Sequence, residues 1–275
     1  MTAALSDRLT LTGDELHVVA SRVGMHEFPT VLAVRSPHAT VDQRNAARDR
    51  AARKLASRKL IDGGSVHPEL VTVLQALQWP DRELAMRLVT PDGIARVSVT
   101  RRGALCVLAR RIADETLLRI IGYHNDVRDV VSAVVAELPK AKPADIEPVA
   151  APLQEVAESL SGTHDAVELG DRARALGAEP RAAMLLGAAL GSRQAFAEIV
   201  YYTLTDAEGR ISRAPAAVAL FYTSRGRVVA APSGSPSGDA WVTLKAGSDH
   251  AVAQAIFQLI GLAEESWSTT SGMAG

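Results

Sequence analysis

The chain has 275 residues, of which 47% are hydrophobic and 22% are charged, and its formal net charge is −1. This composition is typical of a soluble globular protein, and it argues against a disordered chain and against a strongly basic nucleic-acid-binding domain. No apolar run approaches the roughly 18–20 residues of a membrane-spanning helix, and the N-terminus lacks the pattern of a secretory signal. We therefore expect a cytoplasmic protein without membrane insertion.

The first part of the chain indicates helices that follow one short strand. Thr12 is a suitable N-cap for a helix that begins at Gly13, and Glu15 is placed to complete a capping box. The sequence FPTVLAV is predicted to form an edge strand between this helix and the next. In chain order, we predict a strand at 8–12, a helix from 13, an edge strand at 28–34, and helices at 41–60 and 68–77.

A β-meander that leads into a helix is predicted next. ELAMRLVTPDGIARVSV and ALCVLARRIADETLLRIIG contain turn residues at 91–93 and 102–103, which indicates about three strands. The helix that follows has one apolar stripe at a spacing of about 3.6 residues. Its members are Val127, Val130, Val131, Val134, Val135 and Leu138.

The same arrangement is predicted a second time after a proline-rich segment at 139–152, whose prolines favour an extended crossing. Three helices at 153–160, 165–176 and 180–190 precede strands in FAEIVYYTLT, AAVALFYTS, GRVVAA and AWVTLKA. A turn at 206–209 and a loop, PSGSPSG at 232–238, interrupt this second meander. The last helix repeats the apolar stripe with Val252, Ala255, Ile256, Leu259, Ile260 and Ala263.

We interpret this pattern as an internal duplication within one compact α+β unit. The predicted parts are an N-terminal half (1–138), a crossing linker (139–152), a C-terminal half (153–263) and a flexible tail (264–275). Joining two αβββα-like halves across a pseudo-twofold axis would give one mainly antiparallel sheet with fewer exposed edges than two separate sheets. We expect helices on one face and near the ends, with the opposite face partly covered.

The strand that begins at Phe196 has two apolar rows, so alternation does not decide which row faces the protein core. Phe196, Val200 and Tyr202 lie in one row, and Ile199 and Tyr201 lie in the other. Either both faces are packed within the fold or one face is kept for a partner.

The sequence has no recognisable catalytic, metal or nucleotide motif. Neither GxxxxGK[ST] nor GxGxxG occurs, and Pro236 takes the place of the nucleophile in GSPSG. The seven histidines are dispersed, and the single cysteine, Cys106, is interpreted as a small core residue. We therefore predict a protein that is not an enzyme and that has no cofactor and no metal site.

A basic helix offers an alternative function. Arginines and lysines concentrate at 44–59, where they could bind phosphates as part of a nucleic-acid-binding regulator. The competing interpretation is a solvated helix that packs through Ala47, Ala51 and Leu55. The near-neutral chain as a whole argues against nucleic acid as a partner.

The order of the parts and several local sequences resemble the EspG family of type VII (ESX) secretion chaperones. The similar stretches are LTLTGDELHVVA, LVTPDGIARVSVTRRGALCVLARR, LLRIIGYHNDVRDVVSAVVAELP and VALFYTSRGRVVAAPSGSP. The resemblance implies a central antiparallel sheet with two helical bundles. It also implies a cytosolic chaperone that binds the apolar helical tip of a PPE protein within a PE–PPE heterodimer. Whether the free protein associates with itself stays open.

Two regions are implied as contacts with such a client. The first is the loop of Thr90, Pro91, Asp92 and Gly93, which on the residues alone is an ordinary hairpin turn. The second is the bundle of the C-terminal half with its adjoining strands, where we place Tyr201 and Phe221 on an open sheet face.

Overall fold

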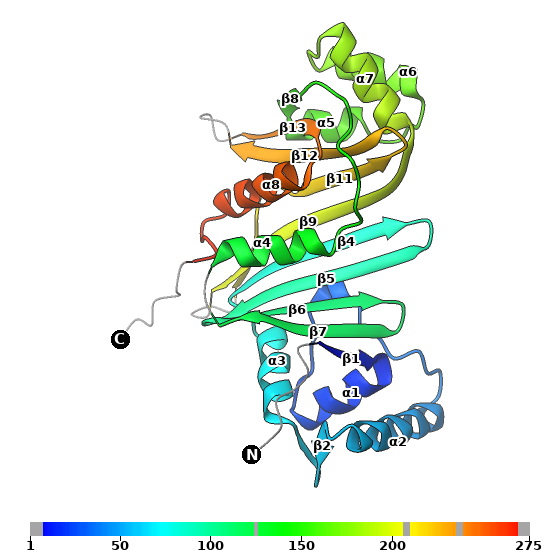
Figure 1. Ribbon diagram of the computed structural model, residues 1–275, viewed down its shortest axis with the longest axis vertical. Helices are drawn as coiled ribbons and strands as arrows, with labels where there is room; N and C mark the ends of the chain where they lie inside the picture. The colour runs from blue at the N-terminus through cyan, green and yellow to red at the C-terminus, as the bar shows by residue number, and fades with distance from the viewer. Residues whose placement is uncertain (1–7, 124–125, 206–209, 235–238, 269–275) are drawn as a thin grey trace.

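One large antiparallel sheet organises the protein (Figure 1). The computed structural model describes residues 8–123, 126–205, 210–234 and 239–268. The predicted turn at 206–209, residues 235–238 of the PSGSPSG loop and the tail beyond 268 lie outside these ranges. Within them, no helix combines the length and the apolar character needed to cross a bilayer.

Each half contributes a run of four strands to the sheet: the four predicted for the second half are confirmed, whereas the first half has one more than the three or so that we expected. The first half has β4 (Arg82–Thr90), β5 (Gly93–Arg102), β6 (Leu105–Ile112) and β7 (Glu115–Gly122). The missed turn joins β6 to β7 through Ala113, whose positive φ of 50° lacks the usual glycine signal. The second half has β9 (Arg193–Thr205), β11 (Val218–Thr223), β12 (Gly226–Gly234) and β13 (Ala240–Ala246), and β10 (Arg210–Arg213) pairs back onto β9.

The two halves of the sheet have the same strand order when each is read from its edge to the centre: an edge strand comes first, and the four strands of the meander follow in reverse chain order. The order runs β1-β7-β6-β5-β4-β9-β11-β12-β13-β8, with β1 (Leu9–Thr12) and β8 (Val149–Pro152) at the edges. The two halves meet where β4 pairs antiparallel with β9, from Arg82 opposite Thr203 to Val89 opposite Phe196. This topology is the one that a twofold axis between β4 and β9 would produce, and the rotation itself stays a prediction.

The proline-rich segment crosses from the first half to the second. It leaves the helix α4 (Val127–Ala136), and the carbonyl of Lys142 accepts a hydrogen bond of 2.7 Å from the amide of Arg227. Its last four residues form β8, which pairs with β13. The segment therefore belongs to the sheet at its end as well as connecting the halves.

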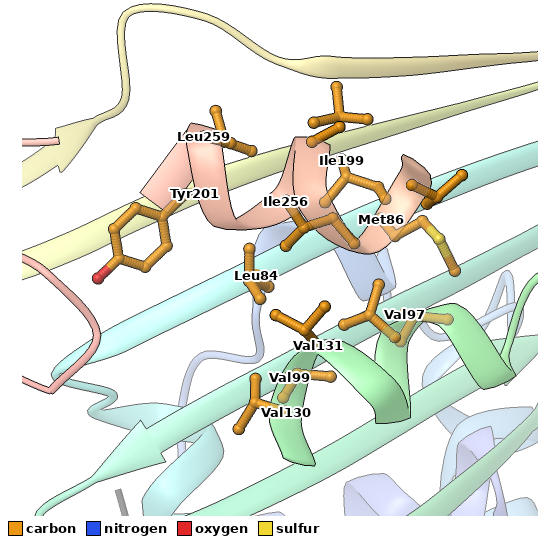
Figure 2. Close-up of a cluster of buried hydrophobic side chains, with 14 of the residues drawn as sticks. Leu84, Met86, Val97, Val99, Val130, Val131, Ile199, Tyr201, Ile256 and Leu259 are labelled. Atoms are coloured by element: carbon orange, nitrogen blue, oxygen red, sulfur yellow. The ribbon is translucent and has the colours of Figure 1, made fainter. Parts of the chain in front are cut away.

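Two helices cover one face of the sheet and enclose the central core. They are α4 and α8 (Asp249–Gly261), which lie in front of the strands in Figure 1. Their predicted apolar stripes point at the sheet, and Figure 2 shows Val130, Val131, Ile256 and Leu259 next to side chains from β4, β5 and β9. Burying each large aliphatic side chain contributes about 1.5–3 kcal/mol, so this layer is a main source of stability.

Tyr201 belongs to this central core, so its expected place on an open sheet face is wrong. The side chain is fully buried beside Leu84 and Ile199 (Figure 2). Its hydroxyl donates a hydrogen bond of 3.1 Å to the carbonyl oxygen of Glu265. Burial raises the pKa of this hydroxyl. The row of β9 that contains Tyr201 faces inward because α8 covers that face.

Residues 264–268 close one end of the same core, so the prediction of a flexible tail beginning at 264 is wrong for these residues. The Trp267 side chain is 1% exposed, and its ring centroid lies 6.1 Å from that of Tyr201. Two buried arginines bind the segment: Arg101 donates to the carbonyl of Trp267, and Arg82 pairs with the carboxylate of Glu265. The Nε of Arg82 also donates to the carbonyl of Ser266 at 3.2 Å.

A helical bundle covers the opposite face at the N-terminal end of the sheet. Its elements are α1 (Gly13–Arg22), the 3₁₀ helix η1 (Thr30–Leu32), α2 (Val41–Ser57), the hairpin of β2 (Ile61–Asp62) and β3 (Ser65–Val66), and α3 (Pro68–Gln78). The predicted capping box is confirmed, since Thr12 and Glu15 exchange hydrogen bonds of 3.2 and 2.8 Å.

The segment 28–34 does not form the predicted edge strand. Its main-chain carbonyls accept hydrogen bonds from arginine side chains, whereas the carbonyls of an edge strand would pair with a neighbouring strand. Arg96 donates to the carbonyl of Val31 at 3.2 Å, and Arg111 donates to that of Leu32 at 3.0 Å. These contacts hold η1 against β4, β5 and β6.

A second bundle covers the same face at the other end of the sheet. It consists of α5 (Leu153–Ser159), α6 (Ala166–Ala175) and α7 (Pro180–Gly191), packed over β8, β12 and β13. The α+β fold with two helical bundles is therefore confirmed. Between the bundles, the middle of this face carries side chains of β4, β5, β9 and β11 that α4 and α8 do not cover.

Candidate functional site

An apolar row crosses four strands in the middle of the partly covered face. The strand register places Ile94 opposite Val89, Val89 opposite Phe196, and Phe196 opposite Phe221. Cross-strand neighbours in an antiparallel sheet point to the same face, so these four side chains form one continuous line. Ile94 is 41% exposed and the other three are partly buried. We call these residues the cross-sheet row.

The row ends in a groove beside the second helical bundle. Phe221 lines this groove together with Leu153, Val156 and Leu160 at α5, and its volume is about 590 Å³. The ring centroids of Phe221 and Phe196 are 5.4 Å apart, which links the groove to the row. Aliphatic side chains and the Phe221 ring make up most of its lining, which is typical of a surface that binds an apolar partner.

Charged groups lie among the groove's lining residues. Arg213 and Glu198 form an ion pair of 3.9 Å between partly exposed side chains. Arg193 donates a hydrogen bond of 2.6 Å to the carbonyl of Thr163. A partner in the groove would therefore meet an apolar centre and polar groups around it.

The predicted contact loop lies at the other end of the cross-sheet row. Thr90 and Gly93 pair across a two-residue turn, and the Thr90 hydroxyl donates to the Gly93 carbonyl at 3.2 Å. Gly93 has a φ of +139°, which favours glycine, and Pro91 and Asp92 are exposed. The prediction of an ordinary hairpin turn at these residues is therefore confirmed for the backbone. The turn also follows Val89 directly, which brings it to the row.

The structure places five of the six residues that sequence reasoning proposed along the cross-sheet row. Thr90, Pro91, Asp92 and Gly93 lie at one end of the row, Phe221 lies at the other, and Tyr201 lies in the core. Sequence reasoning did not propose Ile94, Val89 or Phe196 as site residues. Their one signal was the alternation of apolar residues, which does not tell which row faces outward.

Two helices of the second bundle, α6 and α7, are in close contact next to the groove. A Cβ added at Gly187 of α7 would lie 2.4 Å from the carbonyl oxygen of Ala166 and 2.6 Å from the amide of Gly170. Glycine therefore lets α7 approach α6, and α7 also carries Leu190 into the groove lining.

Gly187→Ala is expected to lower the free energy of unfolding by about 1–3 kcal/mol, because the helices must separate to admit the methyl group. Urea denaturation would measure this loss. Gly261→Ala is the matched control, since a Cβ there meets no atom within 4 Å and Gly261 is also helical. Equal stability of the two variants would contradict the close packing of α6 and α7.

The basic helix α2 has a structural role that accounts for part of its charge. It buries Ala47, Ala51 and Leu55, as the solvated-helix interpretation predicts. Lys54 and Arg58 both lie within ion-pair distance of the buried Glu15 carboxylate, at 3.3 and 3.2 Å. These two cations attach α2 to α1.

In the described ranges, no group of three or more histidine, cysteine, aspartate or glutamate side chains is placed to hold a metal ion. Burial raises the pKa of the Cys106 thiol to about 11, so the thiolate needed for nucleophilic attack is scarce at neutral pH. Cys106 packs in the central core, as expected.

Comparison with known proteins decides the family. A model described as the EspG family matches residues 12–258, which is most of the chain. The chain belongs to the EspG family. This finding confirms the resemblance seen in the sequence.

Individual EspG proteins align with nearly the whole chain. The ESX-3 secretion-associated protein EspG3 of Mycolicibacterium smegmatis is 27% identical over 94% of this chain and 88% of that relative. The ESX-1 secretion-associated protein EspG1 of Mycobacterium marinum is 26% identical over 92% of this chain and 87% of its own length.

A solved structure shows the same fold. It is that of the Mycobacterium tuberculosis type VII secretion system chaperone EspG5 in complex with a PE25–PPE41 dimer. The TM-score is 0.77 at 17% identity, over 95% of this EspG-family chain and 99% of that chain.

Proposed function

We propose that this protein is a type VII secretion chaperone that binds the apolar helical tip of a PPE protein within a PE–PPE heterodimer. The observation that supports this most directly is the continuous apolar path from the hairpin turn through Val89 and Phe196 to the groove at Phe221. Relatives named as ESX secretion-associated proteins, and the EspG5 complex with PE25–PPE41, give the class of client.

The surface suits the end of a helical protein. An exposed apolar tip favours aggregation, and covering it with a complementary apolar surface keeps the client soluble until export. A stable protein interface buries roughly 800 Å² on each partner, which exceeds what one hairpin turn provides. We therefore assign the contact to the Thr90–Gly93 turn, the cross-sheet row and the groove together.

The remaining parts of the proposal follow from this client. Binding before export places the protein in the cytoplasm. Recognition and shielding involve no bond making or breaking, so we propose no catalytic role. No cofactor is required for these contacts.

Co-expression with PE–PPE pairs tests the proposal. We expect a stable complex that survives size-exclusion chromatography, and more soluble PPE protein than in cells that lack the chaperone. An unrelated helical heterodimer of similar size is the control and is expected not to co-purify. Failure to bind any PE–PPE pair from the same cell would overturn the proposal.

A further inference from the structure

The N-terminal bundle, which lies at the opposite end of the sheet from the second bundle (Figure 1), contains a second pocket. The pocket has a volume of about 450 Å³ and is bounded by α1, by α2 and by the segment 25–35. This size is in the range of small-molecule sites. Its location separates it from the client surface proposed above, and the inference does not depend on that function.

The charged groups that line this pocket are all basic. Its described lining includes Arg35, Arg48, His17 and His26 and contains no carboxylate. The groove, by contrast, includes Glu198. Among the described residues, the guanidinium groups of Arg35 and Arg48 have neither an ion-pair partner nor a hydrogen-bond partner. Two arginines without a carboxylate suit a bidentate anion such as phosphate or carboxylate.

A buried nitrogen in the lining also lacks a partner. The Nε2 atom of His17 is buried and has no hydrogen-bond partner in the described part of the chain. Buried polar atoms usually have a partner, so an atom without one in a pocket lining indicates a ligand or water. The His17 ring also lies edge-on to Phe28, with centroids 6.0 Å apart. Phe28 and Met25 add apolar lining to the same pocket.

We propose that this pocket binds a small organic anion, with its phosphate or carboxylate at Arg35 and Arg48 and its apolar body against Phe28 and Met25. Calorimetric titration with phenyl phosphate and with benzoate distinguishes the two head groups. Inorganic phosphate tests the head group without the apolar body. We expect saturable one-site binding of at least one of the ring-containing probes, at least about tenfold tighter than inorganic phosphate.

Single arginine variants show whether the pocket is the binding site. Arg35→Ala and Arg48→Ala are expected to weaken binding of the ring-containing probe about tenfold or more, since hydrogen bonds to charged groups contribute about 1.5–3 kcal/mol. Arg50→Ala is the matched control, because Arg50 is an exposed arginine of α2 outside the pocket lining. Equal losses in all three variants, or no saturable binding of any probe, would overturn the proposal.

The His17 ring provides a readout that general charge attraction would not move. The pKa of the His17 ring is lowered, mainly by burial and then by the charges of Arg48 and Arg111. The charge of Asp14 and the hydrogen bond with the Arg35 main chain act in the opposite direction. A bound anion favours the protonated ring, so the tighter probe is expected to raise this pKa in an NMR titration. His38 is the control, because it already pairs with Asp14 at 2.8 Å. An unchanged His17 pKa at saturation would contradict binding in this pocket.

Discussion

Trp267→Ala is expected to lower the free energy of unfolding by about 3–5 kcal/mol, a large part of the 5–15 kcal/mol typical of a domain. The side chain is 1% exposed and fills the central core beside Tyr201. Its removal leaves a cavity and loosens the segment whose carbonyl and carboxylate groups bind the buried Arg101 and Arg82. Urea denaturation followed by circular dichroism would measure the loss.

Trp79→Ala is the matched control for this experiment. Its side chain is 51% exposed and lies 5.3 Å below the guanidinium of Arg102, so the expected loss is about 1 kcal/mol or less. Trp267→Phe should lie between wild type and Trp267→Ala, because it keeps part of the apolar contact. If Trp267→Ala were no less stable than Trp79→Ala, residues 264–268 would not be part of the core.

Phe221→Asp is expected to weaken client binding at least about 30-fold, which corresponds to the 2 kcal/mol of an interface hot spot. A carboxylate in place of the ring would lose its water when the client binds, and the two arginines of the lining are already engaged, Arg213 with Glu198 and Arg193 with the Thr163 carbonyl. Phe221 is only partly buried, so the variant should still fold. Affinity for a purified PE–PPE pair, measured by calorimetry, gives the result.

Two further variants separate a binding defect from a folding defect. Phe257→Asp changes a 37% exposed phenylalanine of α8, on the other face of the sheet, and should leave client affinity unchanged. Tyr201→Asp buries a charge in the central core and should abolish cooperative unfolding. If Phe221→Asp folded and bound the client as tightly as Phe257→Asp, the groove would not be the contact surface.

Local patterns were sufficient for the helices that cover the central core. The stripes beginning at Val127 and Val252 repeat at a spacing of about 3.6 residues, and a helix with such a stripe must bury it against something. The structure confirms both helices and their inward faces. The Thr12 cap and the turn at Pro91 are equally local, since each depends on residues within one turn of chain.

Contacts between distant residues decided the features that were predicted wrongly. The segment 28–34 is apolar enough for a strand, but Arg96 and Arg111 bind its carbonyls from more than 60 residues away. Trp267 lies in a polar C-terminal sequence, and its carbonyl accepts a hydrogen bond from Arg101, which is 166 residues distant. No local pattern contains these partners.

The sequence by itself determined the α+β class, the repeated order of strands and helices, and the family. Only the tertiary structure decided which apolar row of β9 is exposed, because both rows satisfy the alternation of a strand. The position of α8 buries Tyr201, and the strand register joins Phe196 to Phe221 beside the groove. A strand's two faces become different only when other elements pack on one of them.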